Sequence, residues 1–160
     1  MKSDDKLFIS LYQKYKTPVY HYAFSILKDE GLAQDVMQET FIRVRSHEHE
    51  YKSYKNVRVW ILRIAHNLSL NCIRDRSREF CEEEIEIVSH ENAERQIEES
   101  DYINSVLRNL KEDERICFTL HYLYNYKYKE IAEITDTPMG TVQTRCKAAR
   151  QKLMRVLGGV

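Results

Sequence analysis

Polar side chains that can contact DNA bases lie near the C-terminus, in the segment TDTPMGTVQTRCKAARQKL that spans residues 135–153. A glutamine amide can pair with adenine, a lysine ammonium can bind guanine, and a threonine methyl group can meet the methyl group of thymine. No acidic residue follows Asp136 in this segment, so it would not repel a polyanion. The residues that we expect to read bases are Thr141, Gln143, Thr144 and Lys147.

Basic residues accompany these side chains and have a different expected role. Five Lys or Arg residues and no acid lie between Pro138 and Arg155. Contacts from arginine and lysine to phosphate oxygens fix the position of a protein on DNA but carry no sequence information. We expect such phosphate contacts from Arg145, Arg150 and Lys152.

A helix-turn-helix is the element that would position these residues. Apolar residues at steps of three and four predict a helix from about Gly140 to Leu157. Its buried stripe would consist of Met139, Val142, Cys146, Ala149 and Leu153. A shorter helix around Ile131 precedes it, with a break over residues 135–138, and the second helix of such a unit enters the major groove. The alternative interpretation is a final helix that serves only the core.

A second set of polar side chains lies on a helix predicted from about Val57 to Arg78. They recur near multiples of 3.6 residues and combine cations with amides, which can bind phosphates and bases. The set consists of Arg63, Asn67, Asn71, Arg74 and Arg78. Because basic helix faces are often simply solvated, solvation is the alternative to DNA binding.

A third set lies in the segment GLAQDVMQETFIRV, where Asp35, Gln38 and Glu39 are spaced i, i+3 and i+4. This spacing places the three side chains on one side of a helix. An acidic helix face usually meets solvent, so these residues alone indicate no partner.

Charge is separated along the chain, although 25 basic residues balance 25 acidic ones overall. Residues 52–78 carry seven Lys or Arg against one acid, whereas residues 79–101 carry ten acids against one arginine. The acidic stretch lacks a sustained apolar stripe, so we predict a linker over residues 79–100. It would join two domains, residues 1–78 and 101–160. We expect both domains to be all-α, because glycine and proline are scarce. The linker is either a solvated connector or an acidic mimic of nucleic acid.

Several classes of function are disfavoured by composition and spacing. No apolar run is long enough to span a membrane and the charged start MKSDDK does not resemble a signal peptide, so we expect a cytoplasmic protein. The four cysteines lack the spacing of a zinc site, which predicts reduced thiols and no metal or other cofactor. No catalytic constellation is recognisable, so we do not expect an enzyme.

Two motif sets, one on each side of the acidic stretch, resemble the bacterial RNA polymerase sigma factors of the extracytoplasmic-function (ECF) group of the sigma-70 family. DVMQETFIRV is similar to the polymerase-binding part of their region two, and VRVWILRIAHNLSLNCIRDRSR resembles their DNA-melting helix. YKEIAEITDTPMGTVQTRCKAARQKL resembles the helix-turn-helix of region four. The resemblance covers nearly the whole chain.

The resemblance implies roles for the three sets. Asp35, Gln38 and Glu39 would contact a coiled coil of the largest subunit of core RNA polymerase. The second set (Arg63, Asn67, Asn71, Arg74 and Arg78), called the basic ladder below, would help to open the minus-10 element of promoter DNA. A loop over residues 46–56 would capture a flipped base. The C-terminal helix would read the minus-35 element.

The resemblance implies three further features. Tyr51 and Tyr54 within the base-capturing loop, and Trp60 shortly after it, are near enough in sequence to supply stacking, although Trp60 is also expected in the core. Asp136 stands where the family usually has glycine, at a turn position that needs positive φ. Sigma factors of this group are commonly held inactive by an anti-sigma factor, which we expect as a further partner.

The main alternative function is a stand-alone helix-turn-helix repressor or activator, and a nucleic-acid enzyme is a more distant one. A repressor needs a dimerisation or effector-binding surface to bind paired half-sites. Neither half of the chain shows an obvious surface of that kind.

Overall fold

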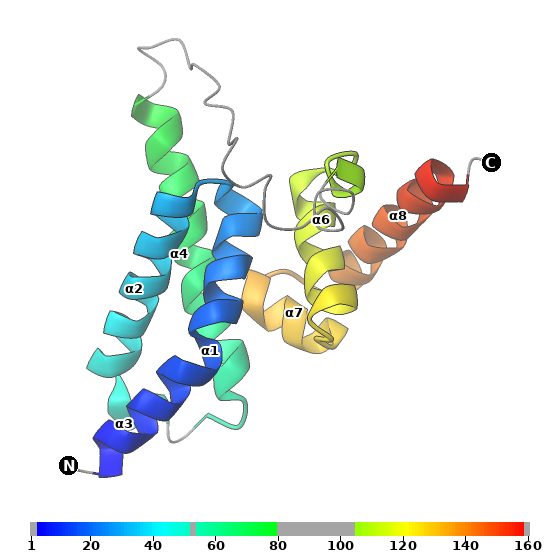
Figure 1. Ribbon diagram of the computed structural model, residues 1–160. Helices are drawn as coiled ribbons and strands as arrows, with labels where there is room; N and C mark the ends of the chain where they lie inside the picture. The colour runs from blue at the N-terminus through cyan, green and yellow to red at the C-terminus, as the bar shows by residue number, and fades with distance from the viewer. Residues whose placement is uncertain (1–2, 52–53, 80–104, 159–160) are drawn as a thin grey trace. The chain divides into compact units, whose positions relative to one another are not determined.

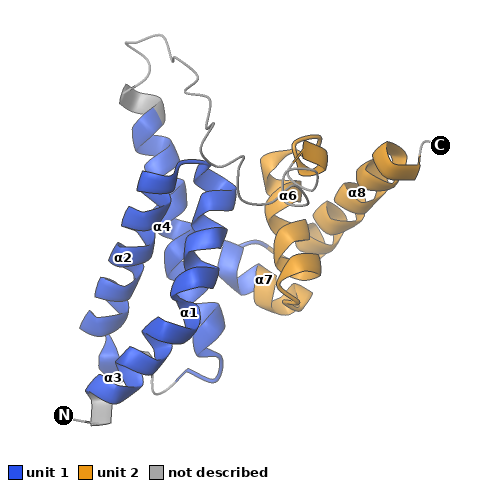
Figure 2. Ribbon diagram, viewed as in Figure 1, with its two compact units in different colours: residues 1–79, 132–137 blue, residues 80–131, 138–160 orange. Residues whose placement is uncertain are grey.

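The computed structural model describes residues 3–51, 54–79 and 105–158, and every regular element in those ranges is helical (Figure 1). This confirms the predicted all-α fold. The chain divides into two compact units: residues 1–79 with 132–137 form unit 1, and residues 80–131 with 138–160 form unit 2 (Figure 2). The predicted linker over residues 79–100 lies outside the described ranges except for Glu79, so its bounds stay a prediction.

Three long helices form most of unit 1: α1 (Ser3–Leu27), α2 (Glu30–Ser46) and α4 (Val57–Glu79). Each of them packs against the other two. Tyr22, Val44 and Ile61, one from each helix, are fully buried. Burying a large apolar side chain contributes about 1.5–3 kcal/mol, so such contacts hold the three helices as one bundle. The bounds of α4 agree with the predicted helix to within one residue.

The turn between α1 and α2 depends on two adjacent residues. Lys28 adopts φ 54°, the left-handed conformation that commonly follows a helix, and its amide donates to the Phe24 carbonyl at 2.8 Å. Asp29 caps α2, because its Oδ1 accepts a hydrogen bond from the Leu32 amide at 2.9 Å. Its Oδ2 lies 3.3 Å from Arg76. One aspartate therefore caps α2 and ties it to α4.

The segment predicted as a loop over residues 46–56 is partly helical. A short helix, α3 (Glu48–Tyr51), follows the end of α2 at Ser46. The His47 amide donates to the carbonyls of Arg43 and Val44, so helical hydrogen bonding continues past the end of α2. Composition alone gave no sign of this turn, because its polar residues are common in both loops and exposed helices.

Unit 2 contains α6 (Glu112–Phe118), the π-helical turn η1 (Thr119–Leu123) and α8 (Met139–Gly158). α6 packs against α8, and one core cluster consists of Val106, Leu107, Leu110, Ala149 and Leu153. The predicted stripe of α8 is confirmed at its four later positions, Val142, Cys146, Ala149 and Leu153. Met139 is instead 48% exposed, because it is the first residue of α8 and lies beyond the packed part of the stripe.

Three residues separate the end of α7 (Tyr128–Thr135) from the start of α8, and a helix-turn-helix requires such a short turn. α7 buries Ile131 and Ile134 fully. Asp136 in the turn has φ 50°, so the expected positive φ is confirmed. The Thr137 amide donates to the Ala132 carbonyl at 3.1 Å and satisfies one of the last acceptors of α7.

Candidate nucleic-acid and protein interfaces

The first half of α8 carries an exposed polar face. Of the predicted base-reading residues, Thr141 is half-buried, and the exposed ones are Gln143, Thr144 and Lys147. Val142, on the opposite side, is fully buried. The Thr144 hydroxyl donates to the carbonyl four residues earlier at 2.9 Å. Because that proton is used within the helix, Thr144 can offer another molecule its methyl group and an acceptor oxygen.

The predicted phosphate contacts of α8 differ in their surroundings. The Arg145 guanidinium is half-buried and lies 3.6 Å from Asp113 of α6. The Lys152 ammonium lies 2.8 Å from the buried carboxylate of Glu114. Arg150, in contrast, is exposed. The first two charges are therefore partly neutralised within unit 2.

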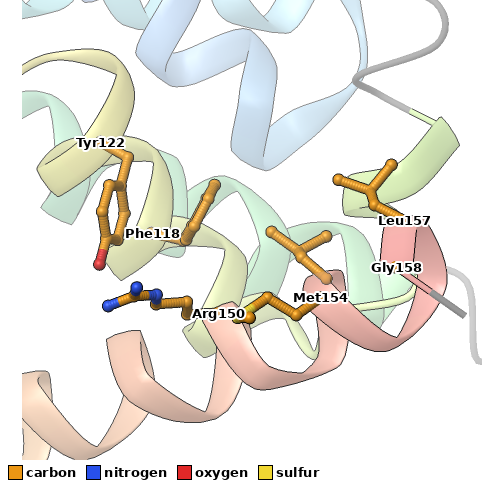
Figure 3. A pocket seen from close by; sticks show the side chains of 7 residues that line it. Phe118, Tyr122, Arg150, Met154, Leu157 and Gly158 are labelled. Carbon is orange, nitrogen blue, oxygen red and sulfur yellow. The ribbon is translucent and has the colours of Figure 1, made fainter.

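A pocket of about 450 Å³ lies beside Arg150 (Figure 3). Its lining is largely apolar and comes from two separated segments, with Phe118, Tyr122, Leu153, Met154 and Leu157 as its main side chains. Figure 3 shows the Arg150 side chain directed toward Tyr122. This pocket was not predicted from the sequence, although Met154 and Leu157 are apolar residues outside the buried stripe of α8 and could have indicated it.

The described members of the basic ladder occupy exposed positions at helical spacing on α4. These members are Arg63, Asn67, Asn71 and Arg74. Arg78 belongs to the same helix, but its side chain lies outside the described residues. The Arg74 guanidinium donates to Oδ1 of Asn71 at 2.6 Å, which holds a cation and an amide side by side.

Two aromatic rings stack next to the start of α4. The rings of Tyr54 and Trp60 have centroids 5.1 Å apart and are inclined by 16°. Tyr54 is 44% exposed, whereas Trp60 is half-buried. An exposed ring supported by a second ring offers a surface on which a nucleic-acid base can stack. Tyr51 was also expected to supply stacking, but its side chain lies outside the described residues.

The acidic face of α2 is exposed over slightly more than one helical turn. Asp35, Gln38 and Glu39 all have exposed side chains. The opposite side of the helix is buried through Val36, Met37, Phe41 and Val44. Glu39 lies 3.5 Å from Arg43, but both side chains are about half exposed and such surface pairs are weak. The face therefore keeps negative charge that a basic partner can neutralise.

Two cysteine thiols meet between α6 and α8. A hydrogen bond to Cys146 lowers the pKa of the Cys117 thiol, while the bond to Cys117 and burial raise the pKa of the Cys146 thiol. The cysteines in the described ranges, Cys72, Cys117 and Cys146, are free. Within those ranges no group of three or more His, Cys, Asp or Glu residues could hold a metal ion. None of the described helices is long and apolar enough to cross a membrane.

Comparison with protein families assigns both halves of the chain. Residues 11–79 match Sigma-70 region 2, and residues 100–153 match Sigma-70, region 4. The first match includes the acidic face of α2 and the basic ladder of α4, and the second includes the helix-turn-helix. The fold and these matches together define a helical, DNA-binding transcription initiation factor of the sigma-70 class.

Individual relatives make the assignment more specific. The chain is 30% identical to the ECF RNA polymerase sigma factor SigM of Bacillus subtilis (strain 168), covering 89% of this chain and 90% of that protein. It is 28% identical to SigW of the same organism, covering 98% of this chain and 91% of the relative. The chain belongs to the ECF group of RNA polymerase sigma factors, which confirms the resemblance seen in the sequence.

Solved structures share the fold. The sigma factor RpoE in complex with the anti-sigma factor NepR from Bartonella quintana matches with a TM-score of 0.78 at 20% identity, covering 96% of this chain and 98% of that chain. CnrH in complex with the cytosolic domain of CnrY matches with a TM-score of 0.68 at 21% identity, covering 97% of this chain and 90% of that chain. Both matches extend over nearly the whole chain.

Proposed function

We propose that three helices of this sigma factor have separate tasks in transcription initiation: α2 docks on core RNA polymerase, α4 opens the minus-10 element, and α8 reads the minus-35 element. The observation that carries the proposal is that one chain combines an exposed acidic face on α2 with an exposed DNA-reading face on α8. A stand-alone repressor needs only the second face. Membership of the ECF group does not favour that alternative.

Docking is assigned to Asp35, Gln38 and Glu39. Two carboxylates and one amide within little more than one turn of helix suit a partner helix that carries Lys or Arg side chains. Their exposure supports the assignment, because contact with a partner then requires no rearrangement of the bundle. The partner implied by the family is the coiled coil of the largest polymerase subunit.

Opening of the minus-10 element is assigned to the basic ladder, Arg63, Asn67, Asn71, Arg74 and Arg78, together with the Tyr54–Trp60 stack. Extracting a base from a duplex costs a few kcal/mol. Stacking on an aromatic side chain returns about 1–3 kcal/mol per base, and arginine contacts to phosphates add to this. The exposed ring of Tyr54 lies within the proposed base-capturing loop of residues 46–56, which suits it to this task.

Reading of the minus-35 element is assigned to Thr141, Gln143, Thr144 and Lys147. Arg145 and Arg150 would contact phosphates of the DNA backbone. Asp113, which faces Arg145, has a side chain that is 68% exposed, so a DNA phosphate can compete for the guanidinium.

Regulation by an anti-sigma factor and a cytoplasmic location belong to the same proposal. The sigma factor RpoE was solved in complex with the anti-sigma factor NepR, and CnrH in complex with the cytosolic domain of CnrY. A protein that covers the α2 face or the α8 face would keep this sigma factor away from polymerase or from promoter DNA.

Reconstituted transcription tests the proposal. Transcript start mapping after overexpression would supply a cognate promoter with both elements. The purified chain should then direct core polymerase to start RNA synthesis at that promoter. A chain that binds no core enzyme, but binds the same DNA tightly and specifically on its own, would instead support the stand-alone regulator.

A further inference from the structure

We propose that Ile42 is an apolar anchor of the polymerase-binding face of α2, an inference that rests on the function proposed above. Ile42 lies at i+7 from Asp35, i+4 from Gln38 and i+3 from Glu39, so the four side chains form one stripe over two helical turns. Its neighbour Phe41 is 3% exposed, whereas Ile42 is 58% exposed. Among the described large apolar side chains of unit 1, none is more exposed.

The surroundings of Ile42 distinguish it from an ordinary surface residue. Single exposed apolar side chains are common and need no explanation. Ile42, however, continues a stripe of carboxylate and amide groups, and the neighbouring Arg43 lies 3.5 Å from Glu39. An exposed apolar side chain next to polar groups is typical of a protein interface, where polar contacts help to keep water from the apolar anchor.

The chemistry of the stripe defines its occupant. Acidic groups at one end and an isoleucine at the other fit a helix that presents basic side chains one or two turns from an apolar one. Seven residues of helix span about 10 Å, so one such helix can cover the whole stripe. A second copy of this chain fits less well, because in a symmetric contact the Glu39 carboxylates near the middle of the stripe would face each other.

The affinity of the full-length chain for core RNA polymerase, measured at low and at high salt, tests this role. Ile42→Ala should weaken binding about tenfold at both salt concentrations, because an apolar contact is not screened. Glu39→Gln should weaken binding at low salt and lose much of this effect at high salt. Alanine is a better helix former than isoleucine, so Ile42→Ala should keep its helical circular dichroism and melting temperature.

Ile9→Ala is the matched control, because Ile9 is 40% exposed on α1 and lies outside the stripe. It should bind polymerase as the parent does, and Ile42→Leu should retain most of the parent affinity. If Ile42→Ala binds as tightly as the parent while Asp35→Lys with Glu39→Lys abolishes binding, Ile42 is not an anchor and the proposed docking function stands. If the double charge reversal itself binds normally, the docking proposal fails. Loss of self-association in Ile42→Ala with unchanged polymerase affinity would assign Ile42 to a contact between copies and also overturn the inference.

Discussion

The Lys152 ammonium lies 2.8 Å from Oε1 of Glu114, whose side chain is only 9% exposed. The second oxygen of that carboxylate is buried without a hydrogen-bond partner among the described residues. A buried carboxylate with a single cationic partner depends strongly on that partner. We therefore assign Lys152 a structural role that joins α6 to α8, instead of the phosphate contact predicted from sequence.

Removing Lys152 should destabilise unit 2. Lys152→Met leaves the Glu114 carboxylate without its cation, and we expect a loss of about 2 kcal/mol in the free energy of unfolding. Glu114→Gln in the same chain should recover part of this loss, because a neutral amide costs less to bury. Urea denaturation followed by far-ultraviolet circular dichroism measures the effect.

Asp113→Ala is the matched control for Lys152→Met, since it breaks the more exposed pair with Arg145 and should cost less than about 1 kcal/mol. Trp60 is the single tryptophan and belongs to unit 1, so its fluorescence shows whether unit 1 is unaffected. Equal losses in the two variants would contradict the structural role of Lys152.

Asp136 should respond to substitution according to its positive φ. Asp136→Gly should stabilise the turn by about 0.5–1 kcal/mol, because glycine adopts φ 50° without steric cost. Asp136→Val should destabilise it by at least about 1 kcal/mol, since β-branched residues tolerate this conformation poorly. Amide hydrogen exchange of α7 and α8 would report both effects, and a more stable valine variant would show that the turn has another conformation.

Lys147 and Arg150 should differ in their effects on DNA binding. Lys147→Ala should cost about 1–3 kcal/mol on the preferred minus-35 element and less on altered elements, because a base contact is lost. Arg150→Ala should weaken binding to all elements equally and lower the salt slope by about one, as expected for a phosphate contact. Polymerase holoenzyme binding to a set of minus-35 variants measures both, and a uniform loss with Lys147→Ala would assign that residue to phosphate.

Tyr54 should contribute to promoter opening through its exposed ring. Tyr54→Ala should slow promoter opening by a factor that corresponds to about 1–3 kcal/mol of lost stacking. Tyr54→Phe should open the promoter at nearly the parent rate, because its ring can still stack. The fluorescence of a 2-aminopurine base in the minus-10 element follows opening directly. If Tyr54→Ala opens the promoter at the parent rate, the Tyr54–Trp60 stack serves only the fold.

Local periodicity predicted much of this fold. The bounds of α4 and α8 follow from where the apolar spacing starts and stops. The positive φ at Asp136 was expected instead from the resemblance to sigma factors, which usually have glycine at this turn position. The exposure of the acidic face of α2 follows from helical spacing alone. The short helix α3 could not be predicted, because a segment of four residues is too short to show the apolar spacing of a helix.

The sequence does not predict which side chains of different helices contact each other. Glu114 and Lys152 are separated by 38 residues, and nothing in either segment indicates that they meet. The pocket beside Arg150 likewise needs side chains from two segments. The sequence predicts α8 as a single basic helix, whereas Arg145 and Lys152 pair with acids of α6 and Arg150 stays exposed.

The affinity of the full-length chain for core RNA polymerase, compared between the parent and Asp35→Lys with Glu39→Lys, tests the central claim most directly. The control is Asp75→Lys with Glu133→Lys, which makes the same change in charge at exposed positions outside the α2 face. We predict that the control binds as the parent does and that the α2 variant loses at least about a hundredfold in affinity, while keeping the circular dichroism spectrum of a folded chain. Parent-like binding and transcription by the α2 variant would contradict the account.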